Sequence, residues 1–197
     1  MEAADACWAY ALNLYARRGV ERACLELQDH CDLNINVLLF CLWMGHSGRA
    51  ELTTVALAPV LTHCLQWHDA VVAPLRRLRR RLRDDPIVPG VSGRDRRALR
   101  RRLLRDELTA ERVAHRLLCA SLTQPPQDAV ELADRCQTSI NNIACYVRRW
   151  GDAPLDAVGQ QAMSTLLSIA YDTLPSRQIH RKALQARLIS PGSAAAR

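Results

Sequence analysis

The stretch DLNINVLLFCLWMGHSG, residues 32–48, leads from an asparagine-rich entry directly into eight consecutive apolar residues, 37–44. Eight residues are far too few to cross a membrane, because a helix needs about 20 to do so. A helix that is apolar on every side must be covered on every side. We therefore expect residues 35–45 to form a central helix around which the other helices pack. Asp32 and Asn34 precede it, where a side-chain oxygen can cap the first free backbone N–H groups.

Helical patterns continue along most of the chain. Alternating strand patterns are absent, and alanine, leucine and arginine, which enter helices at little cost, dominate the sequence. We predict an all-α fold, a compact bundle of about seven helices around the central one. Pro59 and Pro74 should break or kink the fourth of them, because proline lacks a backbone N–H and clashes with the preceding turn. The predicted helices are residues 4–17, 20–30, 35–45, 51–83, 94–122, 127–149 and 155–174.

The domain organisation follows from length and local composition. A chain of 197 residues with 49% hydrophobic content can bury one sizeable core, so residues 1–174 are predicted to form a single helical domain. Within it, the segment DDPIVPGVSG at 84–93 contains two prolines and two glycines, which predict a turn between two arginine-rich helices. Residues 175–197 have little apolar content and are predicted to be a weakly ordered tail.

The N-terminal region and the cysteines bear on the compartment. The first residues carry acids where a signal peptide needs bases, and no long apolar segment follows, so we expect a soluble protein of the cytoplasm. The eight cysteines include no C-x-x-C pair. In a reducing compartment they are expected to be free thiols, most of them in the core.

Several segments carry a family resemblance. The pattern YALNLYARRGVERACLELQDHCDLNINVLLFCLWMGHSGR at 10–49 is followed by QW at 66–67, VVAPLRRLRRRL at 71–82 and ELTAER at 107–112. Over residues 8–122 the chain resembles a family of small proteobacterial proteins that is defined as a conserved domain of unknown function. The resemblance implies a bacterial, cytoplasmic, helical protein, and it brings no activity, cofactor or catalytic residue with it.

Charge is the strongest functional signal in the sequence. Residues 76–105 hold thirteen arginines and three aspartates, a local balance of +10 in a chain whose formal charge is +7. With the leucines of each helix facing inward, helical periodicity predicts an outward basic surface on both arginine-rich helices. If the 84–93 turn folds these helices back on each other, the two faces meet. The predicted partner- or anion-binding residues are Arg76, Arg77, Arg80, Arg101, Arg102 and Arg105.

Arginine binds the oxyanions of phosphate and carboxylate groups through its planar fork. Such a surface suits an acidic protein, nonspecific nucleic acid or acidic lipid headgroups. The chain has no helix-turn-helix or zinc-finger signature, so sequence-specific recognition is not expected. The alternative is a merely solvated face, because Lys182 is the only lysine and arginine serves everywhere as the cation. We expect a non-catalytic binding, adaptor or regulatory protein.

A second signal is predicted inside the bundle. Glu107, Glu111 and His115 recur every four residues beside apolar stripes, so the carboxylates are expected to be partly buried. A buried carboxylate must be paired, protonated or bound to metal. It could pair with arginines such as Arg17 or Arg18, bind a metal with Asp29 or His30, or line a small-ligand pocket. The candidate pocket residues are Gln28, Asp29, Asn36, Trp43, Glu107, Glu111 and His115.

Catalytic motifs do not support an enzyme strongly. The chain lacks a phosphate-binding loop, a nucleophile elbow, a dinucleotide fingerprint and the Glu-x-x-His pairs of carboxylate-bridged metal bundles. No metal or cofactor is predicted. The alternative function is a helical metal- or small-molecule-dependent enzyme with its carboxylate site at Glu107 and Glu111.

Overall fold

The computed structural model describes residues 3–84, 90–120, 122, 125–127, 129–151 and 154–190. Over these residues the chain is helical and contains no strand, which confirms the all-α prediction. None of the described helices is both long enough and apolar enough to span a membrane. The elements are α1 (Ala3–Tyr15), α2 (Val20–Cys31), α3 (Ile35–His46), α4 (Thr54–Trp67), the π-helical η1 (His68–Val72), α5 (Ala73–Asp84), α6 (Gly93–Cys119), α7 (Leu132–Trp150), α8 (Ala157–Ala170) and α9 (Ser176–Gln185).

Helix α3 is the centre of the core, as the apolar stretch predicts. Its residues 36–45 are all buried, and it packs against α7, α1 and α6. Asn34 caps it, because its Oδ1 accepts hydrogen bonds from the N–H of Asn36 at 3.1 Å and of Val37 at 3.4 Å. Asp32 instead ends α2 in a left-handed conformation.

The contact between α3 and α7 depends on a glycine. A Cβ atom added to Gly45 would lie 2.3 Å from the carbonyl oxygen of Arg135 and 2.3 Å from Oγ of Ser139. The same Ser139 hydroxyl donates to the carbonyl oxygen of Leu42 at 2.8 Å. Two backbones therefore approach closely in the middle of the core, where any larger side chain would push them apart.

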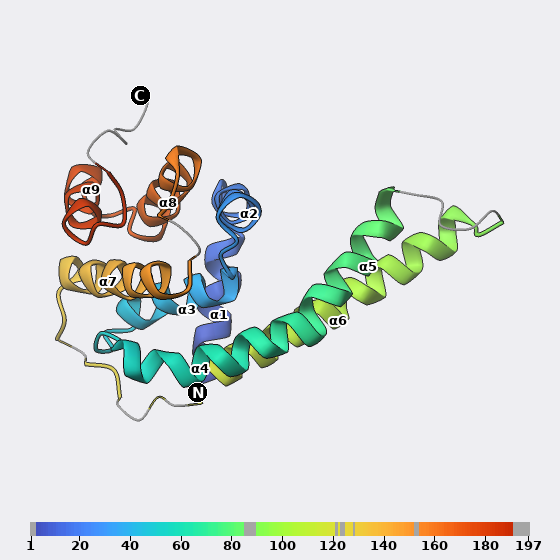
Figure 1. Cartoon of the computed structure of the whole chain (residues 1–197), viewed down its shortest axis with the longest axis horizontal. Coiled ribbons are helices and arrows are strands. Elements are labelled where there is room, and N and C mark those ends of the chain that lie inside the picture. Colours follow the sequence, from blue (N-terminus) through green and yellow to red (C-terminus); the bar gives the residue numbers. More distant parts are fainter. Residues whose placement is uncertain are drawn as a thin grey trace.

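Helices α5 and α6 form an antiparallel pair that extends away from the other helices (Figure 1). We call residues 73–119 the arginine hairpin and the remaining helices the body. Helix α6 has 27 residues and is therefore about 40 Å long at 1.5 Å per residue. Its C-terminal half packs against α1, α3 and α4, and its N-terminal half reaches outward beside α5. The turn predicted at 84–93 lies partly outside the described residues, which resume at Gly90.

The prolines predicted to interrupt the fourth helix act differently from each other. Pro59 lies inside α4 without ending it, one turn after Val55, which is exposed. Pro74 lies in the first turn of α5, directly after η1. There the N–H of Ala73 bonds to the carbonyl of His68, five residues back, so the helix widens by one residue per turn instead of breaking.

The C-terminal segment corrects a prediction. Residues 175–197 were expected to be weakly ordered, but α9 packs against α7 and α8. Ile179 and Ala183 form its buried face, and the chain then turns at Arg187 so that Leu188 and Ile189 are also buried. Four apolar residues are thus enough to anchor the segment, and residues 191–197 lie outside the described part of the chain.

Candidate binding site at the arginine hairpin

Where the hairpin joins the body, two arginines of α5 hold two glutamates of α6. Arg76 donates from Nε to Glu107 at 2.9 Å, from Nη2 to Glu111 at 2.5 Å and from Nη1 to Oε1 of Gln28 at 2.6 Å. Arg79 donates to both carboxylate oxygens of Glu107, at 2.5 and 3.2 Å. These charge-assisted, partly bidentate bonds tie α5 to α6 and to α2.

The two glutamates respond differently to this environment. Burial by itself would raise the pKa of Glu107, but hydrogen bonds from Arg79 and Arg76 outweigh it, and the pKa of Glu107 is lowered. For Glu111, burial outweighs the attraction of Arg76, and the nearby charge of Glu107 adds to it, so its pKa is raised. Glu107 is therefore the firmly ionised member of the pair.

This network corrects two sequence predictions. Arg76 was expected on the outward face, but its side chain is only 17% exposed because it neutralises two carboxylates that face α5. Pairing with arginines was one of three possibilities for the glutamates, and the structure shows it, but the partners are Arg76 and Arg79 instead of Arg17 or Arg18. Arg17 instead pairs with Asp172, at the surface of the body.

Other arginines of the hairpin face solvent. Arg77, Arg101, Arg102 and Arg105 are exposed as predicted, and Arg80 is half-buried. We use the name outer arginines for seven exposed residues, which are Arg77, Arg81, Arg94, Arg97, Arg101, Arg102 and Arg105. Within the described ranges, none of these seven forms an ion pair with an acid.

A cavity of about 560 Å³ opens between the hairpin and helices α1, α2 and α3, and we call it the hairpin groove. It brings together four of the seven predicted pocket residues, Gln28, Asn36, Glu107 and Glu111. Asn36 is buried in the first turn of α3, as the sequence indicated. The structure thus brings these four residues together in one cavity and places the other three outside it.

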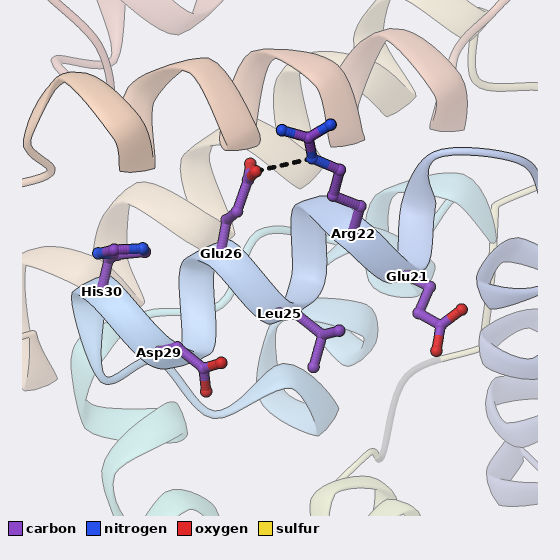
Figure 2. Close-up of a pocket in the computed structure, with 6 residues that line it drawn as sticks. All are labelled: Glu21, Arg22, Leu25, Glu26, Asp29 and His30. Carbon is purple, nitrogen blue, oxygen red and sulfur yellow. Dashed lines mark hydrogen bonds and ion pairs between the residues drawn. The ribbon is translucent and has the colours of Figure 1, made fainter.

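The remaining three predicted residues lie elsewhere. Asp29 projects from an exposed side of α2, where it borders a shallow 300 Å³ pocket (Figure 2). In that view Glu21 and Asp29 point to one side of the helix, and the bonded pair of Arg22 and Glu26 points to the other. Glu21 and Leu25 border both this pocket and the hairpin groove, whereas Asp29 borders this pocket alone.

Trp43 and His115 are both in the core. Trp43 is 3% exposed, and the guanidinium of Arg49 lies 5.0 Å from its ring centre. His115 is fully buried, with Nδ1 3.1 Å from Sγ of Cys7, and burial lowers its pKa to about 4. His115 is therefore a neutral packing residue at pH 7.

The geometry also bears on metal binding. Among the described residues, no group of three or more histidine, cysteine, aspartate or glutamate side chains is placed to hold a metal ion. Both oxygens of Glu107 are occupied by guanidinium groups. The metal alternative for the 107/111 pair therefore gains no support from the placement of these side chains.

Sequence reasoning missed part of the groove. Arg79 was not singled out, although it lies one helical turn after Arg76 and faces the same glutamates. The leucines of α6 were expected to face inward, but Leu104 and Leu108 line the groove and are 43% and 39% exposed. The spacing of leucines alone identifies a shared helix face, and it does not say whether anything covers that face.

Fold and site together define an all-α protein with a projecting, arginine-rich helical hairpin and an amphiphilic groove at its base. The chain belongs to the family described as "Protein of unknown function (DUF2390)", whose model matches residues 6–118. That match ends one residue before the C-terminus of α6, so it includes the hairpin up to residue 118 and excludes α7, α8 and α9. No curated protein and no solved structure matches the chain significantly.

Proposed function

We propose that this protein is a non-catalytic binding protein whose arginine hairpin contacts an acidic partner. The observation that carries the proposal is that some hairpin arginines are paired with glutamates while others are exposed to solvent. Arg76 and Arg79 form ion pairs with Glu107 and Glu111. The outer arginines keep their positive charge exposed on an arm that projects from the body.

The spacing of the outer arginines favours a regularly charged partner. Arg94, Arg97, Arg101 and Arg105 recur at three- and four-residue intervals and so share one face of α6. A face of this kind can follow the phosphates of a nucleic acid backbone without reading bases. Nonspecific nucleic acid is therefore the partner class that we propose first, and an acidic protein surface is the alternative.

The cytoplasmic localisation expected from the sequence belongs to this proposal. All eight cysteines are free thiols. A protein with eight free thiols suits a reducing compartment, where disulfides do not persist. A bacterial cytoplasm would also supply nucleic acid and acidic proteins as partners.

The carboxylate enzyme is the untested alternative, and Glu107 is poorly placed to act as its general base. A general base needs a free oxygen near its substrate. Glu107 offers none in this arrangement, because Arg76 and Arg79 occupy both of its oxygens.

The proposal is tested by measuring the affinity of the full chain for labelled double- and single-stranded nucleic acid. We expect the triple substitution Arg101→Gln, Arg102→Gln and Arg105→Gln to weaken binding strongly and about equally for different sequences. The matched control replaces Arg18, Arg177 and Arg181 with glutamine, which removes the same charge from exposed positions of the body.

The control variant should bind almost as well as the unmodified protein. Equal losses in the two triple variants would show that net charge, and not the hairpin, determines binding. Absence of binding to any nucleic acid would contradict the first partner class and leave the acidic protein surface as the remaining candidate.

A further inference from the structure

The hairpin groove exposes large apolar side chains from three helices. Leu12 of α1 is 45% exposed, Leu25 of α2 is 37% exposed, and Leu104 and Leu108 of α6 are 43% and 39% exposed. All four line the same cavity, together with Trp8 and Tyr15. Isolated exposed leucines are ordinary on protein surfaces, but their convergence on one concavity is a feature of binding sites.

Among the described residues, two arginines of the groove are neutralised within it, and a third, Arg80, is not. Arg76 and Arg79 are matched by Glu107 and Glu111, which line the same cavity. Arg80 of α5 also lines it, and the remaining acid, Glu21, lies across the groove on α2. Arg80 makes no ion pair with any acid in the described part of the chain. An anionic group is therefore favoured on the α5 side of the groove.

We infer that the hairpin groove binds a single-chain amphiphile with an anionic head, a carboxylate or a phosphate. The leucines of α1, α2 and α6 would cover the apolar chain, and Arg80 would contact the head. The cavity volume of about 560 Å³ lies within the range of small-molecule sites, which combine apolar walls with a few placed polar groups.

This site is separate from the proposed nucleic acid surface. Its leucines and Arg80 lie at the base of the hairpin, whereas Arg101, Arg102 and Arg105 do not line the groove. The two can therefore be tested with different variants, and either can fail without the other.

The probes are sodium dodecanoate and dodecyl phosphate, each kept below its micelle-forming concentration, with dodecyltrimethylammonium as the control of equal chain length. Calorimetric titration of the full chain should show that both anionic probes bind at least tenfold more tightly than the cationic one. Trp8 lines the groove and serves as an internal reporter. Its fluorescence response should disappear in a Trp8→Phe variant while calorimetric binding persists.

Two pairs of variants locate the binding site. Arg80→Gln should weaken the anionic probes roughly tenfold, the loss expected for one charge-assisted hydrogen bond, while Arg101→Gln should not. Leu108→Asn should weaken all anionic probes, while Leu99→Asn, at an exposed leucine of α6 outside the groove, should have no effect. Circular dichroism should confirm that each variant keeps its helix content.

Several outcomes would overturn the inference. These are absence of saturable binding by either anionic probe, equal affinity for the cationic probe, and equal effects of Leu108→Asn and Leu99→Asn. Binding only to vesicles that contain phosphatidylglycerol, with none to the monomeric probes, would assign the surface to membranes instead of to a single amphiphile. A preference between dodecanoate and dodecyl phosphate would support the inference and identify which anionic head the site accepts.

Discussion

One guanidinium at the base of the hairpin bonds to groups from two other helices. Arg76 reaches Glu107 and Glu111 on α6 and Gln28 on α2, and Arg79 adds a bidentate contact to Glu107. Breaking a buried ion pair by removing one partner is costly, because the other charge stays buried without compensation. At the residue scale, this network ties α5 to α6 and to α2 at the point where the arm leaves the body.

The first prediction concerns Glu107, whose side chain is 5% exposed. Replacing it with glutamine removes the charge but keeps the shape, so Arg76 and Arg79 lose a charged acceptor. We expect the free energy of unfolding to fall by about 1.5–3 kcal/mol in chemical denaturation at pH 7. The control, Asp106→Asn at the neighbouring exposed position, should change it by no more than about 0.5 kcal/mol.

The same pair of proteins gives a pH test. The pKa of Glu107 is lowered in the folded state from the ordinary value of 4.5. A carboxylate of this kind stabilises the fold above its unfolded pKa, and that contribution is lost as the pH falls through the folded value. The stability difference between the unmodified protein and Glu107→Gln should therefore be largest at neutral pH and shrink below about pH 4.5. A difference that grew on acidification would contradict the pairing.

Prediction from the sequence at this scale succeeds for the burial of Glu107 and fails to identify which arginines pair with it. The position of Glu107 beside apolar stripes indicated a buried carboxylate, and its side chain is buried. The same helical wheel placed Arg76 outward, because a wheel orders residues by angle to the leucines and contains no information about a neighbouring helix. The acids that turn Arg76 inward lie 31 and 35 residues further along the chain.

At the scale of elements, the hairpin depends on how α6 begins. Ser92 caps the helix, since its Oγ accepts from the N–H of Asp95 at 3.1 Å and bonds to the Asp95 carboxylate at 2.7 Å. This arrangement is similar to a capping box, with the Asp95 side chain turned back toward the cap residue. Because the N-terminal half of α6 contacts mainly α5, such local interactions matter more there than in the body.

We predict that Ser92→Ala lowers the local stability of the first turns of α6 by about 0.5–2 kcal/mol. Amide hydrogen exchange should accelerate near residues 93–97, while α3 keeps its protection because the core is unaffected. Ser92→Thr, which retains the hydroxyl, should exchange almost as slowly as the unmodified protein. Uniform acceleration across both α3 and α6 would show instead that the hairpin and the body unfold as one unit.

Element prediction works where the signal is local. The apolar stretch at 37–44 identified α3, and Asn34 identified its start. The prolines were harder to interpret, because a π-helical turn before Pro74 lets the helix continue where regular α-helical geometry would not. Helix α9 was missed because its apolar residues are few, and their burial is supplied by α7 and α8.

At the scale of the whole molecule, the helical core and the exposed positive charge belong to different parts of the structure. The body buries the apolar sequence around α3, and the hairpin carries most of the excess positive charge outward. The sequence predicted the concentration of charge and a turn between the two arginine-rich helices. It could not predict that the two helices would extend away from the body, because that depends on which part of α6 packs against the other helices.

The slope of nucleic acid affinity against salt concentration tests the central claim most directly. Removing one phosphate-binding arginine should reduce that slope by about 0.9 on double-stranded DNA, so replacing Arg101, Arg102 and Arg105 together should make it shallower by up to about 2.7. The Arg18, Arg177 and Arg181 control should keep the slope of the unmodified protein. An unchanged slope in the hairpin variant, or an equal decrease in both variants, would contradict the assignment of the outer arginines as the binding surface.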